Sequence, residues 1–400
     1  MNKPTHLLTA CVIGAAAWQM PAGAGEWSGY ISGEWRGFVD APEDPRQHGN
    51  NLSLSAQPEY YQEWDGGRQS FTFTPFVRWD ENDPERSHAD IRELAWLKVG
   101  DDWELRAGVR KVFWGVAESQ HLVDIINQTD LVEAPDGEEK LGQPMINLAL
   151  IRDWGTVDLF VLPGFRERTF PGEKGRLRFP LPVDTGQTEY ESAREQRHVD
   201  YALRWSHYLG EWDLAVSYFN GTSRDPNYPL GLDAQGRPVL VPFYPQIEQL
   251  GLELQATLDA WLWKAEVISR SGQGDRPYVA LTAGFEYTFV GVFDSQADIG
   301  MVSEILYDDR GNQALTPFAD DLMLGARFTL NDAQSTEALL GVILDSDDST
   351  RIVTLESSRR LGEDWKLSIE AQGFLNVARN DFLYGLRRDN YLQLELARYF

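Results

Sequence analysis

The amino-acid sequence predicts an all-β protein, a transmembrane antiparallel up-and-down β-barrel of about eighteen strands. Three observations support this fold class. Segments in which apolar and polar side chains alternate recur along the whole chain, short and long connections alternate between them, and the last alternating segment ends on Phe400.

The alternating segments have the two-residue period of a strand rather than the period of a helix. In the first one, Ile31 and Trp35 lie on one face and Glu34 lies on the other. About sixteen strands is the alternative, because 144–163 and 297–306 are weakly patterned. The predicted strands cover residues 27–39, 51–63, 69–79, 89–99, 103–113, 144–152, 154–163, 197–209, 212–220, 246–258, 261–270, 278–289, 297–306, 319–330, 337–345, 350–360, 365–377 and 389–400.

The connections favour a membrane barrel over a soluble sandwich. Short turns, such as 210–211 and 362–364, alternate with long polar connections, such as 40–50 and 221–245. A membrane barrel has this asymmetry, with short turns at the periplasmic rim and long loops at the external rim. A soluble sandwich has no reason for so strict an alternation.

Tryptophan follows several of the short turns. Trp103, Trp212 and Trp365 each begin a predicted strand and share a face with the leucine two residues later. An amphipathic ring at the same height on several strands is typical of an aromatic girdle at a membrane interface. The alternative is packing in a sandwich core, but a core tryptophan would suit the middle of a strand.

The first 24 residues have the pattern of a secretory signal peptide. Lys3 is the only charge before an apolar stretch, and residues 22–24 offer an A-x-A cleavage site. The mature chain, 25–400, is then expected to be a single barrel domain without cysteine, because Cys11 is removed. The alternative, a lipoprotein processing box at Cys11, would leave an apolar core of only a few residues.

Composition limits the remaining classes. The net charge of −26 argues against nucleic acid as a partner, because phosphate binding needs a basic surface. The predicted mature region also lacks the long apolar run that a transmembrane helix needs. Strands therefore remain as the way in which this chain would cross a membrane.

The C-terminal segment resembles the terminal signature of Gram-negative outer-membrane β-barrels. Phe400 is preceded by Leu396, Leu394 and Leu392 at alternate positions, although Arg398 places a charge where an apolar residue is usual. The resemblance implies location in the outer membrane, recognition by the barrel-insertion machinery, and closure of the barrel against the first strand. The strand number is similar to that of substrate-selective porins.

Four arginines are expected to face the barrel interior as candidate pore-lining residues. Arg78, Arg92, Arg106 and Arg110 cluster on adjacent predicted strands, where a basic wall would attract anionic solutes. The alternative is that they pair with neighbouring carboxylates and only brace the wall.

Residues 113–143 form the most informative connection. It contains HLVDIINQTDLVE, which is too apolar to lie in water and fits a helical turn or two. We expect this connection to fold into the lumen as a constriction or plug, with the bend at Trp114-Gly115. The alternative is a cap over the top of the barrel.

Three acids of this connection complete the set of pore-lining candidates. Asp124, Asp130 and Glu133 are expected to face the wall that carries Arg106 and Arg110, and opposed charge at a constriction selects solutes by sign.

No enzyme, cofactor or metal site is expected. Ser119, His121 and Asp124 lie close in sequence, but such a set arises by chance in any polar loop. Acidic runs from Asp80 and from Asp345 offer oxygens for Ca²⁺ without the spacing of a defined calcium loop.

One external stretch, 165–179, is basic and is expected to touch anionic lipid or a ligand. The sequence thus predicts a porin-like channel for small polar or charged solutes in the outer membrane, in contact with lipid and lipopolysaccharide and capable of forming an oligomer. The alternative is a plugged barrel that serves as a scaffold or partner of an export or envelope-assembly system.

Overall fold

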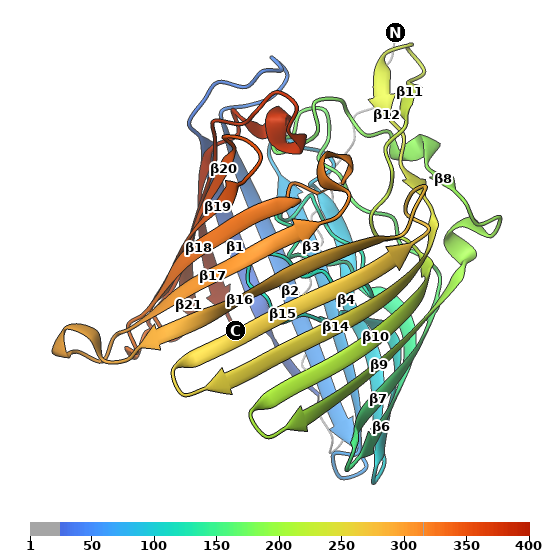
Figure 1. Ribbon diagram of the computed structural model, residues 1–400, viewed down its shortest axis with the longest axis vertical. Helices are drawn as coiled ribbons and strands as arrows, with labels where there is room; N and C mark the ends of the chain where they lie inside the picture. Colours follow the sequence, from blue (N-terminus) through green and yellow to red (C-terminus); the bar gives the residue numbers. More distant parts are fainter. Residues whose placement is uncertain (1–24, 315) are drawn as a thin grey trace, which may run out of the picture.

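A closed barrel accounts for most of the chain in the computed structural model, which describes residues 25–314 and 316–400. The predicted signal peptide, 1–24, lies outside the described residues. Within them, eighteen strands form one sheet, as the sequence predicted. Figure 1 shows these strands running obliquely side by side, with the long loops gathered at one end.

The eighteen barrel strands agree with the predicted ranges to within a few residues. They are β1 (Glu26–Phe38), β2 (Asn50–Trp64), β3 (Gln69–Asp80), β4 (His88–Val99), β5 (Trp103–Arg110), β6 (Gln143–Arg152), β7 (Gly155–Pro163), β9 (Val199–Leu209), β10 (Trp212–Thr222), β14 (Gln246–Leu258), β15 (Trp261–Ser271), β16 (Tyr278–Phe289), β17 (Asp298–Asp308), β18 (Asp320–Thr329), β19 (Glu337–Asp345), β20 (Arg351–Leu361), β21 (Trp365–Leu375) and β22 (Tyr391–Tyr399).

Small elements occur in the connections. The long loops carry β8 (Glu189–Tyr190), β11 (Leu230–Leu232), β12 (Pro238–Leu240), β13 (Phe243–Tyr244), η1 (Thr185–Gln187), η2 (Glu195–Arg197), η4 (Gly311–Gln313) and η5 (Phe382–Leu386), while η3 (Val292–Asp294) lies in the turn between β16 and β17. None of the helices in the described ranges is long and apolar enough to cross a membrane.

Each barrel strand pairs antiparallel with the next barrel strand along the chain, and β22 pairs with β1 to close the barrel. At this seam Trp35 lies opposite Leu394, and the backbone N–H of Phe400 donates to the carbonyl oxygen of Gly29 at 3.1 Å. The expected closure of the last strand against the first is therefore confirmed.

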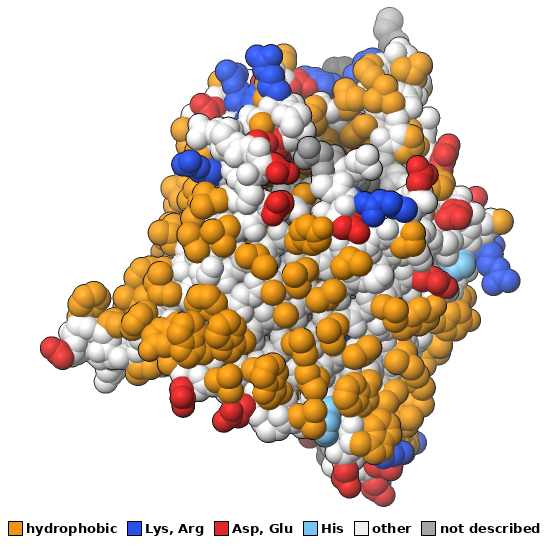
Figure 2. All heavy atoms as spheres, in the orientation of Figure 1, with side chains coloured by type: hydrophobic (Ala, Val, Ile, Leu, Met, Phe, Trp, Pro, Cys, Tyr) orange, Lys and Arg blue, Asp and Glu red, His pale blue; other side chains and the backbone are white. Residues whose placement is uncertain are grey.

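The two faces of the sheet differ as the alternation predicted. In β1, Ile31 is 57% exposed on the outer face, whereas Ser32 and Glu34 are buried on the inner face. Figure 2 shows hydrophobic side chains spread over the outer face, with charged side chains gathered toward its two ends. A proline in β3 is accommodated because the ladder to β4 has a bulge between Thr74 and Pro75.

The buried apolar cores lie inside the barrel. The largest joins Trp114, Val123, Ile125 and Ile126 of the connection between β5 and β6 to the inner face of the wall. The wall residues of this cluster are Met145, Phe160, Leu162, Ala202, Phe219, Ile247, Ile268, Tyr278 and Ala280.

Candidate functional site: a segment held across the barrel interior

Residues 113–143, called here the crossing segment, contact the inner face on two sides of the barrel. On the side of β15 and β17, two buried carboxylates bind its backbone. Glu266 accepts hydrogen bonds from the backbone N–H groups of Val116 at 2.7 Å and Ala117 at 2.9 Å. Glu304 accepts from the backbone N–H and from the hydroxyl of Ser119, at 2.8 and 2.6 Å.

These contacts explain why the expected helical turn is absent. Between Lys111 and Gly142 the chain forms bends, turns and isolated bridges but no helix. A helix would direct its backbone N–H groups to carbonyl oxygens four residues earlier. Within this stretch the backbone N–H of Val123 donates to Glu266 at 3.2 Å instead, and hydrogen bonds to a charged group are the stronger kind. The helical expectation for this stretch was therefore wrong.

Gly115, where the sequence predicted a bend, has a backbone conformation that favours glycine, although the first bend of the crossing segment lies at Glu118 and Ser119. Gly115 has a φ of +139°, and a Cβ atom there would lie 3.0 Å from a carboxylate oxygen of Glu266. Glycine is required because the backbone is in a conformation that side chains disfavour and because it approaches the wall closely.

On the side of β3 and β4, arginines bind the acids of the crossing segment. Arg78 contacts Glu133, with the closest nitrogen and oxygen atoms 2.8 Å apart. Arg92 contacts Asp130 at 2.7 Å. Arg86, which follows β3, donates to the carbonyl oxygen of Val132 at 2.8 Å.

Asp124, Asp130 and Glu133 were expected to face the wall that carries Arg106 and Arg110, but these two arginines have other partners. Arg106 contacts Glu104 on its own strand, and Arg110 lies 3.7 Å from Glu93 on β4. Asp124 instead pairs with Lys140 of the crossing segment itself, at 3.3 Å. The acids bind closer arginines because the segment turns toward β3 and β4 before it reaches β6.

Each of the four predicted wall arginines thus has a carboxylate partner. Arg78 also donates to Glu34 at 3.1 Å, and Arg92 also contacts Asp90 at 3.1 Å. The arrangement corresponds to the bracing alternative, in which wall arginines pair with neighbouring acids.

The residues considered for hydrolase chemistry do not form a catalytic set. Ser119 donates its hydroxyl proton to Glu304. His121 contacts Glu138 through Nε2 at 3.3 Å, and its pKa is raised to about 10 because this carboxylate outweighs the opposing effect of burial. In the described ranges, no hydrogen bond joins Ser119 to His121.

The basic stretch 165–179 finds its partners within the chain. Arg166 contacts Asp90 at 2.8 Å and Arg168 contacts Asp225 at 2.7 Å. These acids come from widely separated strands or loops, so the stretch runs across the long-loop end of the barrel.

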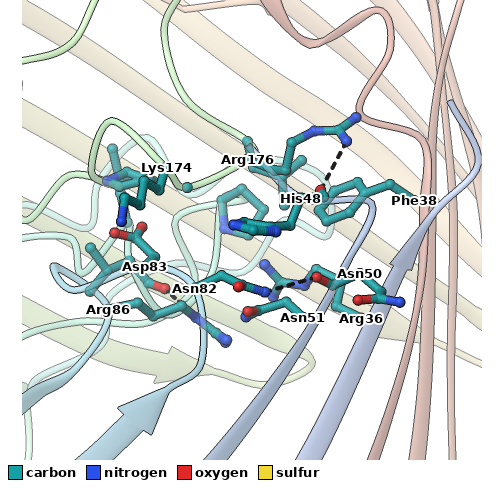
Figure 3. Close-up of a pocket in the computed structure, with 16 residues that line it drawn as sticks. Arg36, Phe38, His48, Asn50, Asn51, Asn82, Asp83, Arg86, Lys174 and Arg176 are labelled. Atoms are coloured by element: carbon teal, nitrogen blue, oxygen red, sulfur yellow. Dashed lines mark hydrogen bonds between the residues drawn. The ribbon is translucent and has the colours of Figure 1, made fainter. Parts of the chain in front are cut away.

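Its second half is anchored at the seam between β1 and β22. Arg176 contacts Asp389 at 2.6 Å and Arg178 contacts Asp44 at 3.0 Å. Figure 3 shows Arg176 beside His48, whose carbonyl oxygen it reaches at 3.3 Å, above a small pocket of about 40 Å³. The stretch was expected to touch lipid or a ligand. Its four arginines, Arg166, Arg168, Arg176 and Arg178, all contact acids of the chain instead.

A cavity of about 580 Å³ remains beside the crossing segment. On one side it is lined by Glu118, Asp136 and Glu138 of the segment, and on the other by the inner faces of strands from β15 to β21. Glu356 of β20 lies on this second side, and both Glu138 and Glu356 are exposed to water.

The tryptophans expected in a girdle lie at strand starts on the outer face. Trp212 is 46% exposed and Trp365 is 40% exposed, while Trp103 is half-buried. Arg398, the departure from the terminal signature, lies near the ring of Trp365, with its guanidinium carbon 5.9 Å from the ring centroid.

Sequence reasoning missed several residues that hold the crossing segment. Glu304 was not singled out because β17 carries buried apolar residues, Val302 and Leu306, on its inner face as well. A signal was present, since Glu304 is the only charge between Ile299 and Leu306 and must face the interior. Arg86 and Arg224 lie in loops, which lack the alternation that shows whether a side chain faces inward or outward.

No protein-family model and no curated protein matches this chain. Among solved structures, a BenF-like porin from Pseudomonas fluorescens Pf-5 aligns with a TM-score of 0.52 at 9% identity, over 94% of this chain and 98% of that one. A variant of the Rh. blastica porin aligns with a TM-score of 0.45 at 11% identity, over 94% and 100%. A loop-deletion mutant of OmpT, an outer membrane protein of Vibrio cholerae, aligns with 0.46 at 8%, over 95% and 100%. At this identity the first likeness shows the fold: this chain folds as a porin-type β-barrel.

Proposed function

We propose that the protein is an outer-membrane channel for passive exchange of small polar or charged solutes. A closed barrel satisfies its backbone hydrogen bonds between strands, so it can lie in lipid. The outer face offers lipid an apolar surface, with Leu340 47% and Ile305 52% exposed. Lipid of the outer membrane is then the immediate partner of the outer wall, with Trp103, Trp212 and Trp365 at the periplasmic interface.

One observation carries the channel function. The crossing segment is held to the β3–β4 side and to the β15–β17 side of the interior, yet a cavity of about 580 Å³ remains beside it. A segment that is fixed and only partly fills a barrel narrows the passage without sealing it. The crossing segment is therefore the constriction of the channel, and this cavity is part of the permeation path.

The plugged scaffold is the competing function, and one experiment separates the two. Purified protein is inserted into planar bilayers, and single-channel conductance is compared with that of a variant lacking residues 121–133. We expect the native protein to conduct and the deletion to conduct several-fold more, because the contacts of Asp130 and Glu133 with the wall are removed.

The matched control is deletion of residues 233–237, the exposed tip between β11 and β12, which should leave the conductance unchanged. A native protein that is silent while the 121–133 deletion conducts would make the crossing segment a plug and favour the scaffold. Equal conductance of the native protein and that deletion would place the constriction elsewhere.

The membrane location has its own test. The protein should fractionate with outer membranes and migrate faster on gels before heating than after it, because a folded barrel resists detergent. Recovery as a soluble periplasmic protein would contradict both the location and the channel.

A further inference from the structure

The inner wall formed by β20, β21 and β22 places carboxylates next to one another. Glu356 lies directly opposite Glu370 in the ladder between β20 and β21, and Glu395 of β22 lies opposite Glu34 of β1. Like charges opposite each other destabilise a sheet. Carboxylates that face each other therefore lower the stability of the barrel. We look for a function of these residues that accounts for this cost.

Of these acids, only Glu34 has arginine partners. Among the ion pairs of the described ranges, none includes Glu356, Glu370 or Glu395. Glu370 accepts hydrogen bonds from the hydroxyl of Tyr391 and from the side-chain amide of Gln393 at 3.2 Å, which are neutral donors. Among the described residues, no ion pair therefore offsets the negative charge of Glu356, Glu370 or Glu395.

The crossing segment adds negative charge on the opposite side of the same cavity. Asp136, Glu138 and Glu118 line it together with Glu356. Glu138 contacts the protonated His121 and Glu118 contacts Arg327, so in the described ranges Asp136 is the acid of the three without an ion pair. Enclosure by the surrounding protein, followed by the charges of Glu370 and Glu138, raises the pKa of Asp136 to about 7.

The arginines that could reverse this field are already neutralised. Each lysine or arginine that lines the cavity contacts a carboxylate: Lys140, Arg168, Arg178, Arg224, Arg270 and Arg310. Arg327, which faces the same interior from β18, contacts Glu118 at 2.7 Å and Glu286 at 3.7 Å. The carboxylates without an ion pair that a solute meets in the cavity are therefore Asp136 on one side and Glu356 on the other, as far as the described residues show.

From this geometry we propose that the channel selects for cations, with Glu356, Glu370 and Glu395 as the residues that determine the sign. The inference rests on the channel function proposed above and goes further by naming the class of solute. No fixed binding site is involved. The summed field of these exposed and half-buried carboxylates raises the local concentration of mobile cations and lowers that of anions.

The test is the reversal potential under a KCl gradient in planar bilayers. The native channel should pass K⁺ in preference to Cl⁻ by roughly tenfold at low salt, and the preference should shrink at high salt as screening increases. The triple variant Glu356→Gln, Glu370→Gln and Glu395→Gln should bring the reversal potential most of the way to zero while still conducting.

The matched control removes three charges from exposed short turns, with Glu211→Gln, Glu363→Gln and Asp364→Asn, and should keep the native selectivity. A second variant, Leu339→Arg, places a cation opposite Glu356 and should lower the cation preference without removing an acid. Heat-modifiable migration confirms that each variant is folded.

A native channel that prefers anions or is unselective would overturn the proposal, as would a triple variant with unchanged selectivity. The complete absence of current, in the native protein and in the variant lacking 121–133, would instead overturn the channel function itself. The two failures therefore give different results.

Discussion

The interior side formed by β1, β3 and β4 buries its charges in pairs, whereas the side formed by β20, β21 and β22 leaves carboxylates in contact with water. Glu34 is 4% exposed and binds Arg86 through both oxygens, each at 2.9 Å. Glu356 is exposed and has no such partner in the described ranges. The difference follows from the crossing segment, which covers the first side and leaves the second open to the cavity. A charge removed from water needs a partner, while a charge that stays hydrated does not.

The largest expected effect is on the covered side. Replacing Glu34 by Gln leaves Arg86 and Arg78 buried without a full counter-charge, so it should lower the free energy of unfolding by about 3–5 kcal/mol. Replacing Glu356 by Gln should change it little, or raise it by about 0.2–1 kcal/mol, because repulsion from Glu370 is relieved. Denaturant unfolding in detergent measures both free energies. Equal losses would contradict the claim that the two sides of the interior differ in how much their carboxylates stabilise the fold.

The next effect separates the inner from the outer face at neighbouring positions. Leu340 faces outward and Leu339 lines the cavity. Leu340→Arg should cost about 2–4 kcal/mol if it lies near the middle of the bilayer. Leu339→Arg should cost far less, because its guanidinium reaches water and Glu356. Unfolding from lipid vesicles tests this, and a reversed order would mean that the faces of β19 are assigned incorrectly.

A smaller effect is expected at the seam where the two sides meet. Deleting Phe400 removes one backbone hydrogen bond to Gly29, so the equilibrium loss should be about 1 kcal/mol. The yield of inserted protein should fall much more, if the terminal residue acts in assembly. Comparing refolding in vitro with assembly in cells distinguishes the two. Equal losses in refolding and in cellular assembly would show that Phe400 has no separate role in assembly.

The smallest effect concerns pH and leaves stability aside. The pKa of Asp136 is raised to about 7, so this carboxyl is largely neutral at pH 6 and charged at pH 8. Cation preference should therefore increase modestly between these values, and Asp136→Asn should flatten the change. His121 stays protonated throughout, since its pKa is raised to about 10. Reversal potentials at both pH values give the result, and an equal change in Asp136→Asn would assign the titration to another group.

The sequence predicted the barrel well because each strand lies between two different environments. The outer face must be apolar and the inner face can be polar. The alternation in β1 and β5 therefore shows, residue by residue, which side chains face outward. Even β17, whose alternation is weak, lies within two residues of its predicted range, 297–306.

The interior arrangement was harder to predict because it depends on pairs that are distant in sequence. Glu266 accepts hydrogen bonds from the backbone at Val116 and Ala117, but nothing near Glu266 in the sequence indicates this contact. Arg78 and Glu133 come from different parts of the chain and meet only when the crossing segment has folded. The sequence also does not predict that Glu356 has no ion pair in the described ranges. This depends on which side of the interior the crossing segment leaves uncovered.

The pairing of β1 with β22 has a consequence for how the molecule forms. Tyr30 lies opposite Tyr399, so the contact that completes the barrel joins nearly the most distant residues of the described chain. Closing so long a loop carries a large entropic cost, and contacts of this kind form late and slowly. Until then β1 presents an unpaired edge, which is prone to aggregate. The time between synthesis of β1 and arrival of β22 is thus the period in which this protein is most exposed to aggregation.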